Sequence, residues 1–200
     1  MKNFIWILGI LLILSGCSTT KTVTPSTRPA AKVTWAERQS ALSQLQSWHL
    51  NGKIAVQTSN DSGSASLDWF TSMNRYSISL AGPLGANAMK LTGSAGQVTL
   101  QMSDGKRYHA SSPEQLLKTQ WGFHLPVSSM NYWIRGLPVP GISARSSLDN
   151  QGRLATLIQQ GYRIDFLSYA NFGKWNLPER LSIVSPSLRV KMIVYQWNVT

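Results

Sequence analysis

The single cysteine, Cys17, has the setting that most clearly indicates chemistry. It follows the small residues Ser15 and Gly16, which end an uninterrupted apolar run of eleven residues from Phe4 to Leu14. A short charged start, an apolar run and small residues before a cleavage point are the features of an export signal. Eleven residues are too few to span a bilayer as a helix. We therefore expect residues 1–16 to be a signal peptide that is removed.

The four residues Leu14-Ser15-Gly16-Cys17 resemble the lipobox of bacterial lipoproteins, in which the cysteine thiol receives diacylglycerol before cleavage. An ordinary secretory signal that happens to contain a cysteine is the alternative, and the lack of any second cysteine to pair with Cys17 disfavours it. One acyl chain anchors a protein reversibly, whereas two or more hold it firmly. Ser18, instead of Asp, follows the cysteine. By the same resemblance, this implies the outer membrane, with the chain facing the periplasm.

Residue combinations that would support catalysis or metal binding are absent from the sequence. His49, His109 and His124 are isolated, without the His-Glu-x-x-His spacing of a zinc site or a Gly-x-Ser-x-Gly nucleophile turn. The single cysteine excludes cysteine-ligated zinc and iron–sulfur centres. No Gly-rich phosphate cradle precedes a predicted helix. We expect no enzyme, no metal site and no cofactor.

The 200 residues are sufficient for one domain, and they are strongly basic, with 19 Lys and Arg against eight Asp and Glu. A net charge of +11 indicates an anionic partner or surface. Arg189 and Lys191 alternate with apolar residues, and Lys106-Arg107 precedes Tyr108, as in some nucleic-acid-binding surfaces. Because an exported lipoprotein meets little nucleic acid, anionic lipid head groups or an acidic carrier protein are better partners. An evenly solvated basic surface remains the alternative.

The mature chain divides into a tether and one domain. Residues 17–33 are rich in Thr, Ser and Pro, which predicts a flexible, acylated tether. A capping box and apolar spacing predict a helix over residues 34–48. From Leu50 to Met102 the apolar residues alternate, with turn residues between the runs, which predicts five or six antiparallel strands. Residues 34–200 are expected to form this single domain.

Two short helices and further strands complete the predicted domain. Ser112-Pro113 begins one helix, and Ser128 or Ser129 begins another, which ends at Gly136. Residues 138–150 are rich in Pro, Gly and Ser, and we expect them to be irregular. Further strands are predicted over the segments 153–159, 162–167, 181–184 and 188–198. About ten strands in meander order predict a mainly β fold, a curved sheet or barrel with helices that cover one opening.

The loop between the runs that end at Leu80 and begin at Met89 departs from ordinary turn composition. Gly82 and Pro83 set a turn, and Leu84 is expected at its apex, where an apolar side chain lowers solubility. In the alternative, Leu84 folds back on the domain.

The sequence resembles the LolB family of outer-membrane lipoprotein receptors of the lipoprotein localisation (Lol) pathway. The resemblance rests on the lipobox, on Gly82-Pro83-Leu84-Gly85, on the Asp104–Tyr108 turn, and above all on Leu125-Pro126 followed by Trp133-Ile134-Arg135-Gly136-Leu137-Pro138. It extends from about residue 35 to residue 198.

This resemblance implies an incomplete antiparallel barrel of about eleven strands, with helices as a lid over an apolar cavity. The ligands would be the acyl chains of other lipoproteins, which the periplasmic carrier LolA delivers to a monomeric receptor. The loop of Gly82, Pro83, Leu84 and Gly85 would help to pass cargo into outer-membrane lipid. The candidates for the cavity wall, which could equally form a sealed core, are Trp69, Ile78, Leu80, Met89, Leu91, Leu100, Trp133 and Met192.

A competing interpretation is a structural or assembly lipoprotein with a filled core. Such a protein would bind an anionic envelope polymer, or another protein, through its basic surface. An apolar cavity of several hundred cubic ångströms would favour acyl binding, whereas a solid core with a clustered basic face would favour the scaffold.

Overall fold

The structure is a computed structural model that describes residues 33–94 and 96–199. The predicted signal peptide, Cys17 and all of the predicted tether except Val33 lie outside the described residues. Every described helix and strand belongs to one compact unit, residues 32–200. None of the helices in the described ranges is both long and apolar enough to cross a bilayer.

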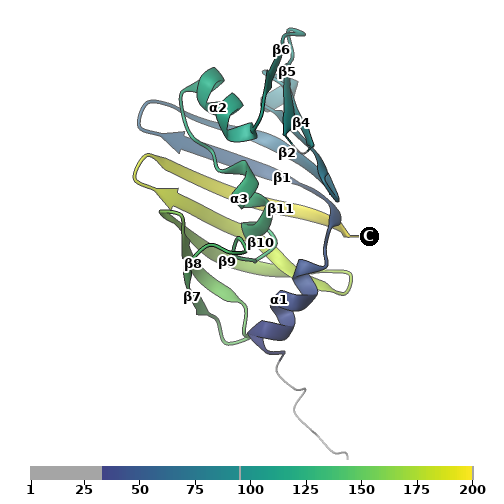
Figure 1. The fold of residues 1–200 in the computed structure, drawn as a ribbon, viewed down its shortest axis with the longest axis vertical. Helices are drawn as coiled ribbons and strands as arrows, with labels where there is room; N and C mark the ends of the chain where they lie inside the picture. Colours follow the sequence, from purple (N-terminus) through teal and green to yellow (C-terminus); the bar gives the residue numbers. More distant parts are fainter. Residues whose placement is uncertain (1–32, 95, 200) are drawn as a thin grey trace, which may run out of the picture. The chain divides into compact units, whose positions relative to one another are not determined.

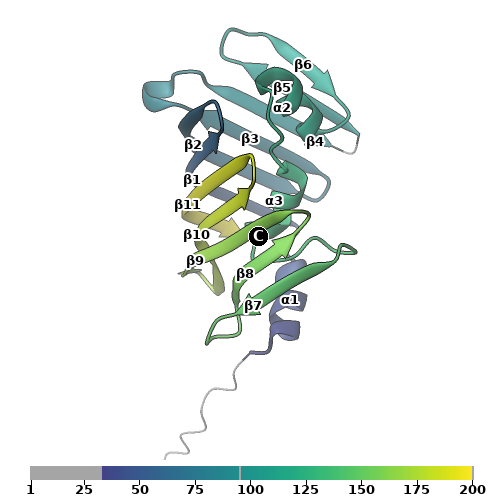
Figure 2. The same ribbon diagram turned by 90° about the vertical axis from the view of Figure 1, so that its left-hand side faces the viewer.

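Eleven strands form one antiparallel sheet in which the first and last strands of the chain are neighbours (Figures 1 and 2). Strand β1 (Ser47–Thr58) pairs with β11 (Leu188–Val199), and the remaining strands extend from this central pair in chain order. On one side lie β2 (Ser62–Ser72), β3 (Arg75–Ala81), β4 (Met89–Ser94), β5 (Gln97–Met102) and β6 (Arg107–Ala110). On the other lie β10 (Trp175–Ser185), β9 (Tyr162–Phe172), β8 (Leu154–Gln159) and β7 (Ala144–Leu148).

The two edge strands of this sheet, β6 and β7, do not pair with each other in the described part of the chain, so the sheet stays open. The predicted fold class, a mainly β incomplete antiparallel barrel of about 10–11 strands with a few helices, is confirmed. Strands β1 to β6 and strands β7 to β11 each follow the predicted meander order, in which neighbours in the chain are neighbours in the sheet. The two meanders meet at the pair β1 and β11, and the long connection from β6 to β7, which contains α2 and α3, joins the two edges.

Alternation along β11 shows why these segments form strands with one buried face. Leu188, Val190, Met192 and Val194 are buried, whereas Arg189 and Lys191 between them are exposed. The alternation shifts where the pairing of β1 with β11 is irregular, between Asn51 and Gly52. This bulge brings the next apolar residues of β11 back to the buried face.

Three helices complete the unit: α1 (Trp35–Ser43), α2 (Pro113–Trp121) and α3 (Val127–Trp133). Helix α1 has the predicted capping box, in which Glu37 N donates to Thr34 Oγ1 at 3.3 Å and Thr34 N donates to Glu37 Oε2 at 2.8 Å. Figure 1 shows α2 and α3 in front of the sheet. We call the sheet face that they cover, which carries the buried side chains, the inner face.

The first predicted helix is too long at its C-terminal end. Residues 34–48 were expected to be helical, but α1 ends at Ser43 and Trp48 lies in β1. Trp48 packs on the inner face between Trp69 and Trp197, with ring centroids 5.6 and 5.2 Å apart. Trp48 and Leu50 are two residues apart, which is the period of a strand. This relation decides the structure of Trp48, although its distance from the preceding apolar residues also fits a helix.

Two strand boundaries also differ from the prediction. The segment 138–150 contains β7, whose five residues are all exposed, so its sequence carries no alternation that could have marked it as a strand. Strand β10 begins at Trp175 and runs through Pro178, although the sequence predicts a strand only from residue 181 and a connection before it. The register with β9 shifts just after Pro178, a place in a sheet where proline is tolerated.

Candidate functional site

An apolar chamber of about 70 Å³ lies between the inner face of the sheet and helices α2 and α3. The sheet contributes the side chains of β1 to β4, and the helical segment contributes residues from Leu117 to Met130. The whole lining is Ile54, Val56, Leu67, Trp69, Ile78, Leu80, Met89, Leu91, Leu117, Trp121, Phe123, Leu125, Val127 and Met130.

A wider mouth of about 310 Å³ adjoins the chamber. The mouth shares six lining residues with the chamber: Ile54, Val56, Leu80, Met89, Trp121 and Phe123. Its outer rim consists of the turn between β1 and β2 and of the loop between β3 and β4, which contributes Gly82, Pro83, Ala86 and Asn87. The apolar space therefore opens at the end of the sheet where these two connections lie.

Two aromatic side chains stand where the mouth meets the chamber. Trp121 ends α2, Phe123 follows it by two residues, and their rings stack with centroids 6.3 Å apart and planes 18° apart. Gly122 between them adopts a φ of 74°, the left-handed conformation that ends a helix. Both aromatic side chains are only partly buried, so they can move without breaking open the core. Neither residue is among the candidates predicted from the sequence, although two aromatic residues that flank a helix-ending glycine are a usable signal.

Five of the eight cavity candidates chosen from the sequence line the chamber, namely Trp69, Ile78, Leu80, Met89 and Leu91. The other three candidates, Leu100, Trp133 and Met192, are at most 1% exposed and line neither the chamber nor its mouth. The structure places these three in closely packed parts of the core. Leu80 and Met89 line both the chamber and the mouth and remain partly exposed.

The loop that forms the rim carries Leu84 at its apex. Pro83–Gly85 form a single 3-10 turn, and the Leu84 side chain is fully exposed, at 107% of its reference area. The loop is tied at its base, because Gly82 N donates to Ala86 O at 2.8 Å and Ala86 N donates to Pro83 O at 3.1 Å. The structure thus contradicts the alternative in which Leu84 folds back on the domain. Figure 2 shows this segment between β3 and β4 projecting from the sheet.

Leu84 also has a backbone conformation that favours other residue types. Its φ of 54° lies in the left-handed region, which costs a residue with a Cβ atom about 1–2 kcal/mol. Burial does not offset this cost, since the side chain has no packing against the domain. An exposed leucine in a strained position is therefore unfavourable for the folded domain alone, and this indicates a role outside it.

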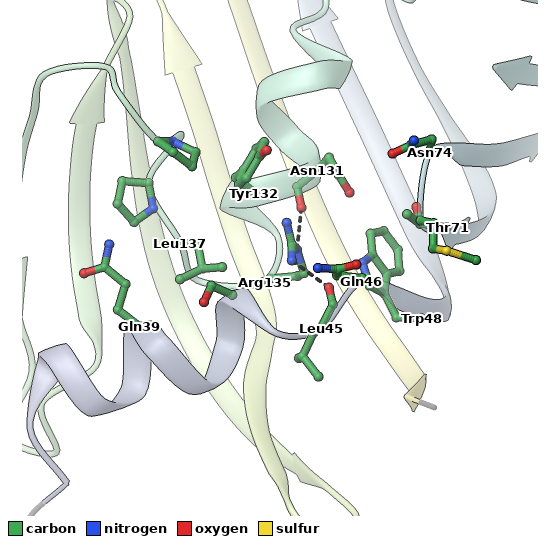
Figure 3. Close-up of a pocket in the computed structure, with 14 residues that line it drawn as sticks. Gln39, Leu45, Gln46, Trp48, Thr71, Asn74, Asn131, Tyr132, Arg135 and Leu137 are labelled. Atoms are coloured by element: carbon green, nitrogen blue, oxygen red, sulfur yellow. Dashed lines mark hydrogen bonds between the residues drawn. The ribbon is translucent and has the colours of Figure 1, made fainter. Parts of the chain in front are cut away.

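A second groove, of about 400 Å³, lies on the other side of α3 and is lined mainly by polar side chains (Figure 3). Arg135 is its most buried charge. The guanidinium donates from Nε to Asn131 O at 2.9 Å and from NH1 to Leu45 O at 2.8 Å, and it lies 5.2 Å from the Tyr132 ring centroid. Burial lowers the pKa of Arg135 below its ordinary value. These contacts join the end of α3 to the connection between α1 and β1, which gives the groove a structural role.

Gln159 joins the chain after α3 to the sheet. This residue of β8 is 2% exposed, and its Oε1 accepts hydrogen bonds from Trp133 Nε1 at 3.0 Å and from Val139 N at 2.9 Å. Its Nε2 donates to the carbonyl oxygens of Val139 and Ile142, both at 3.0 Å. The Trp133–Pro138 segment links α3 to Val139, and Gln159 forms hydrogen bonds to both Trp133 and Val139. Together they hold α3 over the inner face.

The polar groups that were considered for catalysis lie apart. His49 contacts Asp68 at 2.7 Å, whereas His109 contacts Thr99 and His124 contacts Tyr162 at other places on the surface. Within the described ranges, no three His, Cys, Asp or Glu side chains gather into a group that could hold a metal ion.

Comparison with known proteins gives the same picture as the geometry. The family model described as "Outer membrane lipoprotein LolB" matches residues 46–197, about three-quarters of the chain. The chain belongs to the LolB family. The resemblance inferred from the lipobox and the Trp133–Pro138 string is confirmed.

Full-length relatives support this assignment. "Outer-membrane lipoprotein LolB" of Pseudomonas syringae is 37% identical over 192 residues, which cover 96% of this chain and 94% of the relative. The protein of the same name from Pseudomonas putida (strain F1) is 42% identical over 164 residues, or 82% of this chain and 80% of the relative. The localisation predicted from the sequence is confirmed: this member of the LolB family is an outer-membrane lipoprotein.

Among solved structures, a LolA superfamily protein from Nitrosomonas europaea matches with a TM-score of 0.55 over 84% of this chain and 94% of that chain. Its sequence is only 9% identical, so this likeness shows the fold alone. The scaffold interpretation is not favoured, because a family of lipoprotein-localisation proteins accounts for the fold and for most of the sequence.

Proposed function

We propose that this protein accepts acylated lipoproteins from the periplasmic carrier LolA and passes them into the outer membrane. The observation that supports this most directly is that the apolar chamber shares a wall of six residues with a mouth whose rim includes the Leu84 loop. In this proposal the chamber and mouth hold acyl chains, and Leu84 enters membrane lipid beside the opening. The protein works as a monomer without cofactor, and nucleic acid is not a partner.

No covalent step and no nucleotide are needed for such a handover. Each acyl CH₂ that is hidden from water contributes about 0.8 kcal/mol, so a lipoprotein in the periplasm must always be held by an apolar site. Cargo moves from one site to another when the second binds it better, as a difference between two binding free energies. We therefore propose a transfer protein and not an enzyme.

The chamber must widen to admit an acyl chain. Its volume of about 70 Å³ is well below the roughly 300–1,000 Å³ of ordinary ligand sites, whereas the mouth, at about 310 Å³, reaches that range. Trp121 and Phe123 line both spaces and are partly exposed. In this proposal these two rings turn aside as the acyl chain passes from the mouth to the chamber.

The remaining parts of the proposal concern residues before the domain. Residues 1–16 are removed as a signal peptide, Cys17 is acylated, and residues 17–33 connect the anchor to a single LolB-like domain, residues 34–200. The lipobox spelled by Leu14 to Cys17 supports this division. The anchor keeps the domain at the membrane that receives the cargo.

A transfer experiment tests the proposed function. The chain from residue 17, with Cys17→Ala, is mixed with an acylated lipoprotein on purified LolA, without nucleotide, and each component is recovered by affinity pull-down. We expect cargo to move to this chain. If all the cargo remains on a carrier that delivers it to another LolB-family receptor, the proposal is refuted.

A matched pair of variants shows whether the chamber carries the transfer. Met89 lines the chamber and its mouth, and its cross-strand neighbour Met102 is equally half-buried but lines neither space. We expect Met89→Lys to lower cargo transfer at least tenfold, because it places a charge in the acyl path. Met102→Lys serves as the control and should transfer cargo at close to the normal rate.

A further inference from the structure

The outer face of the sheet, opposite to α2 and α3, carries a row of arginines at the same end as the chamber mouth. The strand register places Arg189, Val184, Arg163, Ile158 and Arg145 next to one another across β11 to β7. Since neighbouring strands are about 4.8 Å apart, the three arginines follow one another at about 10 Å. All three are exposed.

The chain topology fixes which end of the sheet this row occupies. Arg189 is the second residue of β11, Arg163 is the second residue of β9, and Arg145 is the second residue of β7. The turns before β9 and β11 lie at the same end as the β1–β2 turn and the Leu84 loop, because the strands alternate in direction. In Figure 2 this end of the central strands faces the viewer.

Beside the row, Arg189 and Lys191 line a groove of about 510 Å³ together with Gln57, Ser62 and Ser64. Two cations and two hydroxyl groups are the donors that a phosphate ester requires. Ser62 and Ser64 also line the chamber mouth, so the cationic groove and the apolar mouth lie on the two sides of one hairpin. A cationic site beside an apolar one matches the two ends of a phospholipid.

The charges of this surface are largely available for a partner. Arg145, Arg189 and Lys191 form no ion pair with any residue that the structure describes, whereas Arg163 pairs with Asp165 at 2.8 Å. Arg189 and Lys191 are two residues apart on the same face of β11, so these two unpaired charges repel each other in the folded domain alone.

We infer that the Arg145–Arg163–Arg189 row and the groove of Arg189 and Lys191 bind the phosphate groups of an anionic phospholipid bilayer. Contact there directs the chamber mouth and the Leu84 loop toward the same lipid surface, a consequence that rests on the proposed function. The binding to phospholipid does not rest on the proposed function, because we infer it from the charges and their position on an outer-membrane lipoprotein.

Vesicle co-sedimentation tests this surface. The chain from residue 17 with Cys17→Ala is used, so that no acyl chain contributes to binding. This chain keeps the whole compact unit 32–200, to which every described helix and strand belongs. Vesicles contain phosphatidylethanolamine alone or with about a third phosphatidylglycerol. We expect stronger binding to the anionic vesicles, which weakens as salt is raised.

Two triple variants with equal net charge separate the surface from the overall charge. The first combines Arg145→Gln, Arg189→Gln and Lys191→Gln. Because each cation near a membrane contributes about fivefold to binding, we expect vesicle binding to fall on the order of 100-fold. The control combines Arg75→Gln, Lys118→Gln and Lys174→Gln, which are exposed but lie elsewhere. The control should lose much less.

Three results would overturn the inference. The first is equal binding of the Cys17→Ala chain, without a triple substitution, to both kinds of vesicle. The second is an equal loss of vesicle binding in the two triple variants. The third is a first triple variant that loses cargo transfer from LolA but binds vesicles as before. The last result would assign the surface to the carrier. Failure of the proposed function is distinguishable, because it abolishes cargo transfer and leaves vesicle binding intact.

Discussion

Replacing Leu84 by Asn should separate the function of the apical leucine from its structural setting. Asn tolerates the left-handed φ of 54° and has nearly the same size, but it removes the apolar surface. Leu84 is fully exposed, so the change buries and uncovers nothing in the folded domain. The free energy of unfolding should not fall, and relief of the backbone strain should raise it by up to about 1 kcal/mol, as measured by urea denaturation.

The effect at the membrane should be much larger. Burying a leucine side chain in an apolar phase contributes about 1.5–3 kcal/mol, which corresponds to roughly 10- to 150-fold in the step that uses it. We therefore expect Leu84→Asn to lower the insertion of cargo into vesicles by one to two orders of magnitude. The assay follows a labelled lipoprotein from this protein into vesicles that float on a density gradient.

The protein contains a closely matched control for this experiment. Met73 is also an exposed apolar residue, at 74% of its reference area, and it has a φ of 50° in a turn at the opposite end of the sheet. Met73→Asn should insert cargo normally. If Leu84→Asn inserts cargo as well as the unmodified chain, or if both variants fail alike, the role assigned to the loop is wrong.

Three further changes test the structure that holds the site. Gln159→Leu leaves the buried Trp133 indole and three part-buried backbone groups without this hydrogen-bond partner. Urea denaturation should show a loss of about 2–3 kcal/mol, and a loss below 1 kcal/mol would contradict this role of Gln159. Gly93→Ala places a Cβ in steric conflict with the Tyr76 ring, so we expect a melting temperature several degrees lower, and an unchanged value would contradict the tight packing. Burial raises the pKa of Asp149, but hydrogen bonds from Arg153 outweigh it and hold that pKa below the ordinary 3.8. The stability from this pair is complete above 3.8 and is lost as the pH falls through the lower folded value, so Asp149→Asn should flatten acid unfolding in that range; an unchanged acid limb would refute the contribution.

The strands were predictable where one face of the sheet is buried. In β11, apolar and charged residues alternate because Val190 and Met192 point to the core and Lys191 points to solvent. Strand β7 was missed because both of its faces are exposed, so only backbone pairing with β8 makes it a strand. Trp48 was assigned to a helix because its side chain suits either period, and tertiary packing against two other tryptophans decides between them.

The chamber was predictable only in part, for a physical reason. Alternation shows which side chains share a face, but Leu91 and Leu100 share the inner face and only Leu91 lines the chamber. The difference depends on where α2 and α3 cross the sheet, which no local pattern encodes. The exposed apex at Leu84 was easier to predict, since glycine and proline around a lone leucine predict a turn without knowledge of the packing.

The central claim is that this chamber receives the acyl chains of other lipoproteins. The most direct measurement uses a cargo lipoprotein that carries a photoreactive group near the end of an acyl chain and is transferred from LolA to this chain before illumination and peptide mapping. The account predicts crosslinks to chamber residues such as Trp69, Leu91 and Met130. Crosslinks confined to the groove around Arg135, or to the outer face of the sheet, would contradict it.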